Sequence, residues 1–134
     1  MKALITAFGS FPGVDINPSE RLLDKLKKVE SYSSFCSFKL LPVDYDFCKG
    51  WLYSLEEKFD LVIHLGVASN ATENRAEILA KNFCGKTADI QGKVNFGKIS
   101  ENSFEKIQSN LSLRFLETKH THPIQVSDDA GDYL

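Results

Sequence analysis

Apolar positions in the first part of the chain alternate between short runs and helical spacings. A mostly apolar run from Lys2 to Phe8 ends at Gly9, which predicts a buried parallel strand. Residues 17–20 (Asn-Pro-Ser-Glu) predict a helix start, because Asn17 can cap the helix and Pro18 suits its first position. The apolar residues of this predicted helix share one face: Leu22, Leu23, Leu26 and Val29.

The same alternation continues through the next forty or so positions. Phe38 to Val43 predicts a second strand, and Asp44 can cap the helix that follows it. The apolar residues of this second helix recur at helical spacing: Cys48, Trp51, Leu52, Leu55 and Phe59. Leu61 to Val67 is almost entirely apolar, which predicts a third strand that is covered on both faces.

The pattern weakens in the second half of the chain. Ala68 to Arg75 is polar and predicts a loop, and Glu77 to Ile99 gives no single prediction, although Val94 to Ile99 fits a short hairpin arm. A further helix is predicted between Ser103 and Lys119, from the spacing of three apolar residues: Phe104, Ile107 and Leu111. Pro123 to Ser127 predicts a last strand.

Strands that alternate with helices predict an α/β fold. Buried strands joined by helical crossovers favour three α/β/α layers around a mostly parallel sheet, and 134 residues fit one domain, 1–134. Sites in such sheets form in the loops after the carboxyl ends of the strands. Four loops qualify: Phe8 to Asn17, the loop after Val43, Ala68 to Glu77, and Ser127 to Leu134.

Composition excludes several classes of function. Hydrophobic residues make up 43% and charged residues 25%, as in ordinary soluble domains, and a net charge of −2 argues against nucleic-acid binding. No run approaches 18 apolar residues, so we expect no membrane span. The apolar run at the N-terminus is too short for a signal peptide, so the expected location is the cytoplasm.

The cysteines and two of the histidines do not indicate a metal site. Cys36, Cys48 and Cys84 are an odd number without a CxxC pair, which argues against both a disulfide framework and a zinc site. We interpret Cys36 and Cys48 as small core residues. His120 and His122 are two residues apart, a weak metal signal that a solvated turn explains as well. No metal or other cofactor is expected.

Residues 6–13 read Thr-Ala-Phe-Gly-Ser-Phe-Pro-Gly, and Asn-Pro-Ser follows at 17–19. This loop resembles the start of the pyroglutamyl peptidase I family, which has TGF-x-PFGG and then N-P-S/T at nearly the same spacing. The chain departs from the family pattern at three positions: Ala7, Ser10 and Pro12.

Four further motifs of the same family follow in order. Residues 41–43 match its L-P-V strand end, and residues 64–67 match its H-V-G-hydrophobic strand. Glu77 falls where the family has its catalytic glutamate, and residues 80–82 continue that motif. Residues 127–134 resemble its S-x-x-A-G-x-Y-L-C without the final cysteine. The resemblance implies a phosphorylase/hydrolase-like α/β fold that is truncated at its C-terminus.

Members of this family are cysteine exopeptidases that remove an N-terminal pyroglutamyl residue, so the resemblance implies a pyroglutamyl peptide as substrate. Two phenylalanines of the family's first loop hold the lactam ring, and they correspond to Phe8 and Phe11. Asn17 belongs to the same implied substrate-binding set. Aromatic faces suit a flat, uncharged ring. The alternative is that Phe8 and Phe11 only pack the loop onto the core.

Glu77 corresponds to the family residue that orients the catalytic histidine, which in turn activates the cysteine. The alternative is that Glu77 is a solvated surface residue. The family's cysteine would follow Leu134 and its histidine lies further on, so we expect this chain alone to be inactive. We do not expect Cys84 or His64 to replace this cysteine and histidine. No histidine is visibly placed beside Cys84 in the sequence, and we interpret His64 as a hydrogen-bonded strand residue.

The missing elements of the family fold would leave an apolar face or edge of the sheet bare, so we expect a homo-oligomer or a complementing chain. Three other interpretations stay open beside that of an incomplete peptidase. The chain is half of a split enzyme, or a non-catalytic module that binds lactam ends, or a flavodoxin-like phosphoacceptor or nucleotide-binding domain. The last needs an acidic pair or a phosphate loop, which residues 9–13 supply poorly.

Overall fold

The computed structural model describes residues 1–69, 71–110 and 124–131. Its contacts separate into two compact units, each of which is described by itself. The first comprises Met1–Val67 and Ala88–Val94, and the second comprises Ala68–Thr87 and the described residues from Asn95 onward. The single domain expected over 1–134 stays a prediction.

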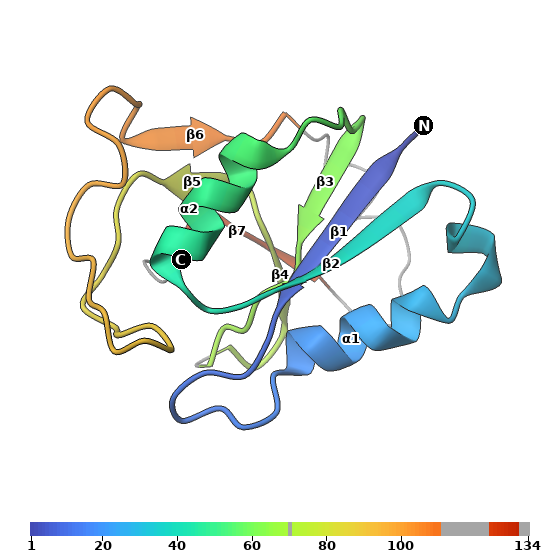
Figure 1. The fold of residues 1–134 in the computed structure, drawn as a ribbon, viewed down its shortest axis with the longest axis horizontal. Helices are drawn as coiled ribbons and strands as arrows, with labels where there is room; N and C mark the ends of the chain where they lie inside the picture. The colour runs from blue at the N-terminus through green and yellow to red at the C-terminus, as the bar shows by residue number, and fades with distance from the viewer. Residues whose placement is uncertain (70, 111–123, 132–134) are drawn as a thin grey trace. The chain divides into compact units, whose positions relative to one another are not determined.

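The first unit is built on three parallel strands (Figure 1). They are β1 (Ala3–Phe8), β2 (Cys36–Leu41) and β3 (Leu61–His64), in the order β2-β1-β3. Ala3 lies opposite the first residue of each neighbouring strand, so all three strands start at the same level of the sheet. Their carboxyl ends therefore lie at one edge, where the loop that starts at Gly9 begins.

Two helices connect these strands: α1 (Pro18–Lys27), which is followed by the short helix η1 (Glu30–Tyr32), and α2 (Tyr45–Ser54). The chain moves from β1 to β2 on one side and then from β2 past β1 to β3 on the other. Because such crossovers are right-handed, the change of direction places α1 and α2 on opposite faces of the sheet, as Figure 1 shows. This arrangement confirms the α/β class and the mostly parallel sheet.

The core of the first unit lies between β1 and α1. Ile5, Ala7 and Leu23 form its centre, and Leu23 is 0% exposed. Further apolar side chains pack against this centre: Leu26, Cys36, Phe38 and Leu65. Removing the Leu23 side chain from water contributes on the order of 2 kcal/mol, so the buried face of α1 fixes the helix beside the end of β1.

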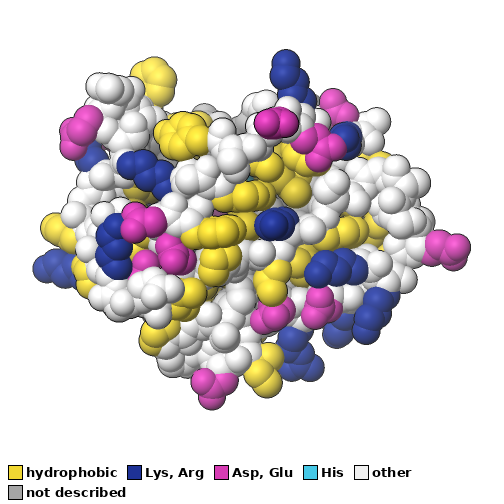
Figure 2. Space-filling view, viewed as in Figure 1, with side chains coloured by type: hydrophobic (Ala, Val, Ile, Leu, Met, Phe, Trp, Pro, Cys, Tyr) yellow, Lys and Arg dark blue, Asp and Glu magenta, His cyan; other side chains and the backbone are white. Residues whose placement is uncertain are grey.

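The third strand departs from the expectation of burial on both faces. The side chains of Val62 and Ile63 are 46% and 39% exposed, although the apolar run predicts a covered strand. The reason is that α1 packs over β1 and β2, while β3 pairs with β1 on one side only among the described residues. Hydrophobic side chains are also visible at the surface on the face seen in Figure 2.

Several element boundaries differ from those predicted, and the third strand ends at His64 rather than Val67. The second strand begins at Cys36 rather than Phe38, because its pairing with β1 starts there. The second helix ends at Ser54 rather than near Phe59, because Leu55 turns to an extended conformation with ψ 103°. Asp60 then donates its N–H to the Lys2 carbonyl at 2.8 Å, which returns the chain to the sheet.

The second unit contains two pairs of short strands. β4 (Asn74–Glu77) pairs in parallel with β7 (Ile124–Ser127), and β5 (Leu79–Lys81) pairs in antiparallel fashion with β6 (Lys106–Gln108). Among the described residues of both units, no helix is long and apolar enough to cross a bilayer.

The predictions for the second unit are tested only in part. Residues 106–108 of the stretch in which a helix is expected form β6, where Ile107 pairs with Ala80, while residues 111–119 lie outside the described part, so a helix there stays a prediction. The hairpin arm expected over residues 94–99 is reduced to a single bridge between Cys84 and Gly97. Helical spacing of three apolar residues is not specific enough to exclude a short strand.

Candidate active site

The loop between β1 and α1 is held by polar side chains of the helix start. Asn17 is only 1% exposed, and its Nδ2 donates to the Gly9 carbonyl at 2.9 Å. Its Oδ1 accepts the Ser19 N–H at 3.0 Å, which is the N-cap bond predicted from the sequence. The Ser19 hydroxyl accepts the Phe8 N–H at 3.2 Å and lies 2.8 Å from Asn17 Oδ1. Both ends of the loop are therefore fixed to the same helix.

A tight turn forms the tip of this loop. Phe11 and Val14 exchange main-chain hydrogen bonds, with the Phe11 N–H to Val14 O at 3.2 Å and the Val14 N–H to Phe11 O at 2.8 Å. Pro12 supplies a fixed φ, and Gly13 adopts φ +85°, which is the requirement of a type II turn. Pro12, a departure from the family pattern, thus fits the local geometry.

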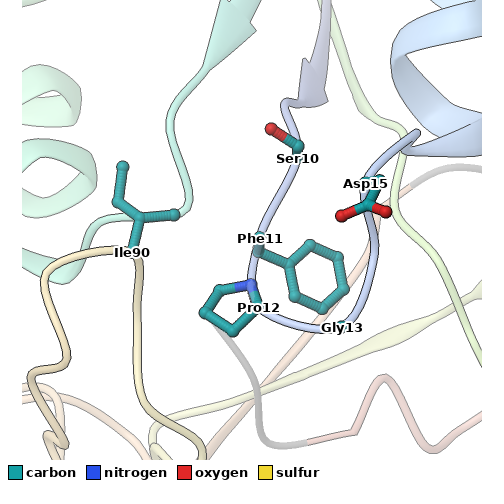
Figure 3. A pocket seen from close by; sticks show the side chains of 6 residues that line it. All are labelled: Ser10, Phe11, Pro12, Gly13, Asp15 and Ile90. Atoms are coloured by element: carbon teal, nitrogen blue, oxygen red, sulfur yellow. The ribbon is translucent and has the colours of Figure 1, made fainter.

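An open hollow of about 320 Å³ lies beside this turn (Figure 3). Its wall is formed by six residues: Ser10, Phe11, Pro12, Gly13, Asp15 and Ile90. The volume lies at the lower end of the range for small-ligand sites. The wall of the hollow exposes more polar than apolar surface, and Asp15 adds one carboxylate to it.

The structure separates the three residues that the sequence analysis assigned to substrate binding. Phe11 lines the hollow, whereas Phe8 ends β1 and Asn17 has its amide engaged by Gly9 and Ser19. A direct contact of Phe8 or Asn17 with substrate stays a prediction.

Sequence analysis missed Ile90, which lines the hollow from a distant part of the chain. Its N–H donates to the Val43 carbonyl at 3.0 Å, just after β2. Periodicity gave no prediction for this stretch. The signal present was the Asp-x-x-Gly sequence at residues 89–92, because aspartate and glycine at these positions favour a turn.

Glu77 lies at the carboxyl end of β4, in the second unit. It is paired in register with Ser127 of β7, and the N–H of the next residue, Ile78, donates to the Ser127 carbonyl at 2.8 Å. The exposed carboxylate of Glu77 is therefore at the strand end beside the loop that starts at Ser127. Glu77 therefore belongs to a strand rather than a turn, and its exposed side chain also fits the alternative of a solvated surface residue.

The loop after β7 is stabilised by Asp129. Its carboxylate pairs with the Lys81 ammonium and accepts the Gly131 N–H at 3.2 Å, while its own N–H donates to the Ser127 hydroxyl at 3.2 Å. The hydrogen bond from Lys81 is the main cause that lowers the pKa of Asp129 below its ordinary value. Residues 128–131 are thus ordered beside Glu77, while residues 132–134 lie outside the described part.

None of the three cysteines forms a disulfide, and each is packed against protein atoms. Cys36 begins β2 and His64 ends β3, so the two residues are about 10 Å apart across the sheet and about 10 Å apart along the strands. Partial burial raises the pKa of the Cys48 thiol, whose Sγ lies 3.4 Å from the Pro42 carbonyl. Cys84 is 3% exposed. A raised pKa makes the Cys48 thiol a weak nucleophile at neutral pH.

His64 is tied to the central strand. Its Nδ1 lies 2.7 Å from the Thr6 hydroxyl, across the β1–β3 pair. Desolvation by surrounding protein atoms lowers the pKa of His64 below its ordinary value. The neutral ring is therefore favoured in the folded state, in keeping with a structural role. His120 and His122 lie outside the described residues.

We expect the stability of the chain to fall as pH decreases from about 7.5 to 5.5, in part through His64. The unfolded state takes up the proton first because its histidine has the higher pKa, so the stabilisation is present above that pKa and is lost as pH falls toward the folded value. Urea unfolding at the two pH values, with His64→Gln as the comparison, measures it. If the free energy of unfolding changes with pH equally in His64→Gln and the unmodified chain, the effect belongs to other groups.

Comparison with known proteins agrees with this geometry. The family model described as pyroglutamyl peptidase matches residues 1–134. The pyrrolidone-carboxylate peptidase of Lactobacillus helveticus is 28% identical over 140 residues, which cover 100% of this chain and 70% of the relative. That of Pyrococcus furiosus is 31% identical over 141 residues, which cover 100% of this chain and 68% of the relative.

Solved structures show the same fold. The pyrrolidone carboxyl peptidase of Fervidobacterium islandicum superposes with a TM-score of 0.87 at 28% identity, covering 99% of this chain and 67% of that one. The enzyme of Thermus thermophilus gives a TM-score of 0.83 at 26% identity, covering 98% of this chain and 71% of that one. The match over residues 1–134 together with these relatives shows that the chain belongs to the pyroglutamyl peptidase family.

Proposed function

We propose that this chain carries the substrate-recognition loop of a pyroglutamyl peptidase, with Phe11 as the main contact of the pyroglutamyl ring. The observation that supports it most is the hollow beside the Phe11–Val14 turn, whose loop is fixed at both ends by Asn17 and Ser19. A rigid loop pays little conformational entropy when a ligand binds.

The chemistry of the hollow suits a small uncharged ring. Phe11, Pro12 and Ile90 offer apolar surface, and the main chain of the loop offers polar groups for a lactam amide. A pyroglutamyl end has no ammonium group, so its ring can be desolvated without burying a charge of the ligand, while the Asp15 carboxylate of the wall is exposed to water. Phe8 and Asn17 are proposed to support the same site, Phe8 from the end of β1 and Asn17 by fixing the loop.

Peptide hydrolysis by this family's chemistry requires a thiolate, a histidine that activates it and a carboxylate that orients the histidine. We assign the last role to Glu77, whose strand end lies beside the loop at residues 127–131. Of the three cysteines in these 134 residues, Cys48 has a thiol pKa that partial burial raises, and Cys84 is 3% exposed. We therefore propose that the 134-residue polypeptide binds the ring but does not hydrolyse the peptide.

Calorimetry tests the binding half of this proposal. Pyroglutamyl-alanine amide should bind with a Kd of about 1 mM or tighter. Prolyl-alanine amide lacks the lactam carbonyl and carries a charge, so it should bind at least about ten-fold more weakly. A change of about ten-fold corresponds to the free energy of about one lost hydrogen bond or one partly desolvated charge. Absence of heat with millimolar pyroglutamyl ligand would reject the recognition role.

A chromogenic pyroglutamyl anilide tests the catalytic half. The 134-residue polypeptide should leave it intact, and addition of the segment that follows the matched region in a related peptidase should restore cleavage. Cleavage by the polypeptide alone would contradict the proposed inactivity. The segment in this experiment is joined covalently to Leu134. Restoration by the same segment added as a separate chain would favour a split enzyme, whereas ligand binding without restoration would favour a lactam-binding module.

We further propose that the exposed apolar side chains of β3 lead to self-association or to pairing with a complementing chain. Val62 and Ile63 lie on a strand with an unpaired edge within the described sheet, which is a template for another strand. Light scattering that reports a monodisperse monomer over a range of concentrations would reject this proposal. The cytoplasmic location expected from the sequence stays a prediction.

A further inference from the structure

A buried carboxylate lies next to the hollow but outside every motif identified in the sequence. Asp89 is 1% exposed, and three main-chain N–H groups donate to it. Its Oδ1 accepts the N–H groups of Gln91 and Lys93, each at 2.9 Å, and its Oδ2 accepts the N–H of Tyr45 at 3.2 Å. Two of these donors belong to its own loop and the third begins α2.

The carboxylate of Asp89 is held in its ionised form. Desolvation opposes its charge, but hydrogen bonds from the main chains of Lys93, Tyr45 and Gln91 and the positive charge of Lys93 outweigh this effect, so the pKa of Asp89 lies below its ordinary value. Burial of a charge is tolerated where such bonds satisfy it. The site therefore needs an acceptor on both carboxylate oxygens, a condition that asparagine does not meet.

The bonds of Asp89 set the position of the next residue. Residues 89–92 form a turn in which the Gly92 N–H donates to the Asp89 carbonyl at 3.0 Å and Gly92 has φ +77°. The Ile90 N–H donates to the Val43 carbonyl at 3.0 Å, and Lys93 Nζ lies 2.6 Å from an oxygen of Asp46. The turn is thus attached to the end of β2 and to the first turn of α2, and Ile90 projects from it.

Ile90 forms the side of the hollow that the first loop does not provide. The other five lining residues all come from residues 10–15, as Figure 3 shows. Among the described residues, Ile90 is therefore the part of the wall that comes from outside the first loop. Ile90 is far from residues 10–15 in the sequence. Its place beside the loop therefore depends on the bonds that attach the 89–92 turn to the end of β2 and the start of α2.

We propose that Asp89 is a positioning residue for ligand binding: by bonding its own turn to the start of α2, it holds Ile90 as the second wall of the hollow. The expected ligand, a small uncharged ring at the end of a peptide, rests on the proposed function. Asp89 itself does not touch the ligand, and it acts through the main chain of Ile90.

The test compares Asp89→Asn with Asp44→Ala in the 134-residue chain. Asp44 caps the same helix through the Phe47 N–H at 2.8 Å, and alanine removes this cap, so Asp44→Ala controls for damage to α2. Asp89→Asn should lower the affinity for pyroglutamyl-alanine amide about ten-fold and speed the exchange of the Ile90 amide about ten-fold. Asp44→Ala should change neither by more than about two-fold, even where both variants lose similar stability.

The outcomes separate the positioning role of Asp89 from the recognition function of the hollow. Unchanged affinity and unchanged Ile90 exchange in Asp89→Asn would overturn the positioning role. Absence of ligand binding by the unmodified chain, with the Ile90 amide still released in Asp89→Asn, would reject the recognition function and retain the positioning of Ile90. If Asp89→Asn does not fold, acid titration of the unmodified chain replaces it.

In that titration, the direction of the pKa shift of Asp89 predicts the pH range in which its hydrogen bonds are lost. Because the pKa of Asp89 is lowered by folding, its bonds persist through the ordinary aspartate range near pH 4 and are lost only below it. The Gln91, Lys93 and Ile90 amides should lose protection together as the carboxylate protonates, before the amides of β1. Loss of protection at the same pH in all four places would contradict the role of Asp89.

Discussion

Replacement of Asn17 with alanine is expected to lower the free energy of unfolding by about 2–3 kcal/mol, the sum of a lost N-cap and an unsatisfied buried carbonyl. Asn17 is buried, caps α1 through the Ser19 N–H and donates to the Gly9 carbonyl. Urea unfolding followed by circular dichroism measures the loss.

Asn17→Asp tests the donor to Gly9 directly. Aspartate keeps the acceptor that caps the helix but sets a buried carboxylate oxygen against the Gly9 carbonyl, so its loss of stability should be at least that of Asn17→Ala. The loop amides at residues 9–15 should exchange faster in both variants. Equal stability of Asn17→Ala and the unmodified chain would show that the helix start does not hold the loop.

The second large effect is expected from Phe11→Ala, which should weaken binding of pyroglutamyl-alanine amide at least about ten-fold, because a large apolar contact of about 1.5–3 kcal/mol is removed. Phe11→Leu keeps much of the apolar area and should lose less. Calorimetric titration at constant temperature gives the three affinities.

Phe104→Ala is the matched control for this experiment. The Phe104 side chain is 82% exposed and does not line the hollow, so its removal should leave the affinity within about two-fold. Equal effects of Phe11→Ala and Phe104→Ala would mean that the ligand binds elsewhere or that both changes act through folding. The half-buried setting of Phe11 favours only a modest change in stability.

The parts of the fold that follow from short-range rules could be predicted from the sequence. The Asn17 cap and Pro18 at the first position fix the start of α1, and Asp44 fixes the start of α2 through its bond to the Phe47 N–H. The strand β1 is buried as its apolar run predicts. Each of these features depends on residues within a few positions of one another, so a local pattern is sufficient to detect it.

The parts that depend on distant pairing could not be predicted in this way. Ile107 has the spacing of a helix but pairs with Ala80 in a strand, and the exposure of Val62 depends on which strands α1 covers. Ile90 lies at the hollow in a turn that bonds to residues far earlier in the chain: its own N–H donates to the Val43 carbonyl, and the Tyr45 N–H, 44 positions before Asp89, donates to the Asp89 carboxylate. No periodicity encodes such a contact, since it is set by tertiary packing.

The candidate site was therefore predicted unevenly. Phe11 was identified through its place in a family motif, and the structure places it on a hollow. Asn17 was assigned to the same site, but its buried side chain donates a hydrogen bond to the Gly9 carbonyl and so fixes the loop. Glu77 lies at the end of β4 as a strand residue, and its proposed role with a histidine rests on its position beside residues 127–131.

The most direct test of the central claim is to locate the bound ring by nuclear magnetic resonance. Isotope-filtered nuclear Overhauser spectra of the 134-residue chain with pyroglutamyl-alanine amide should show contacts from the ring methylenes to the Phe11 ring and the Ile90 methyl groups, both of which line the hollow. Ring contacts to residues remote from the 10–15 loop, or no contacts at millimolar ligand, would contradict the account.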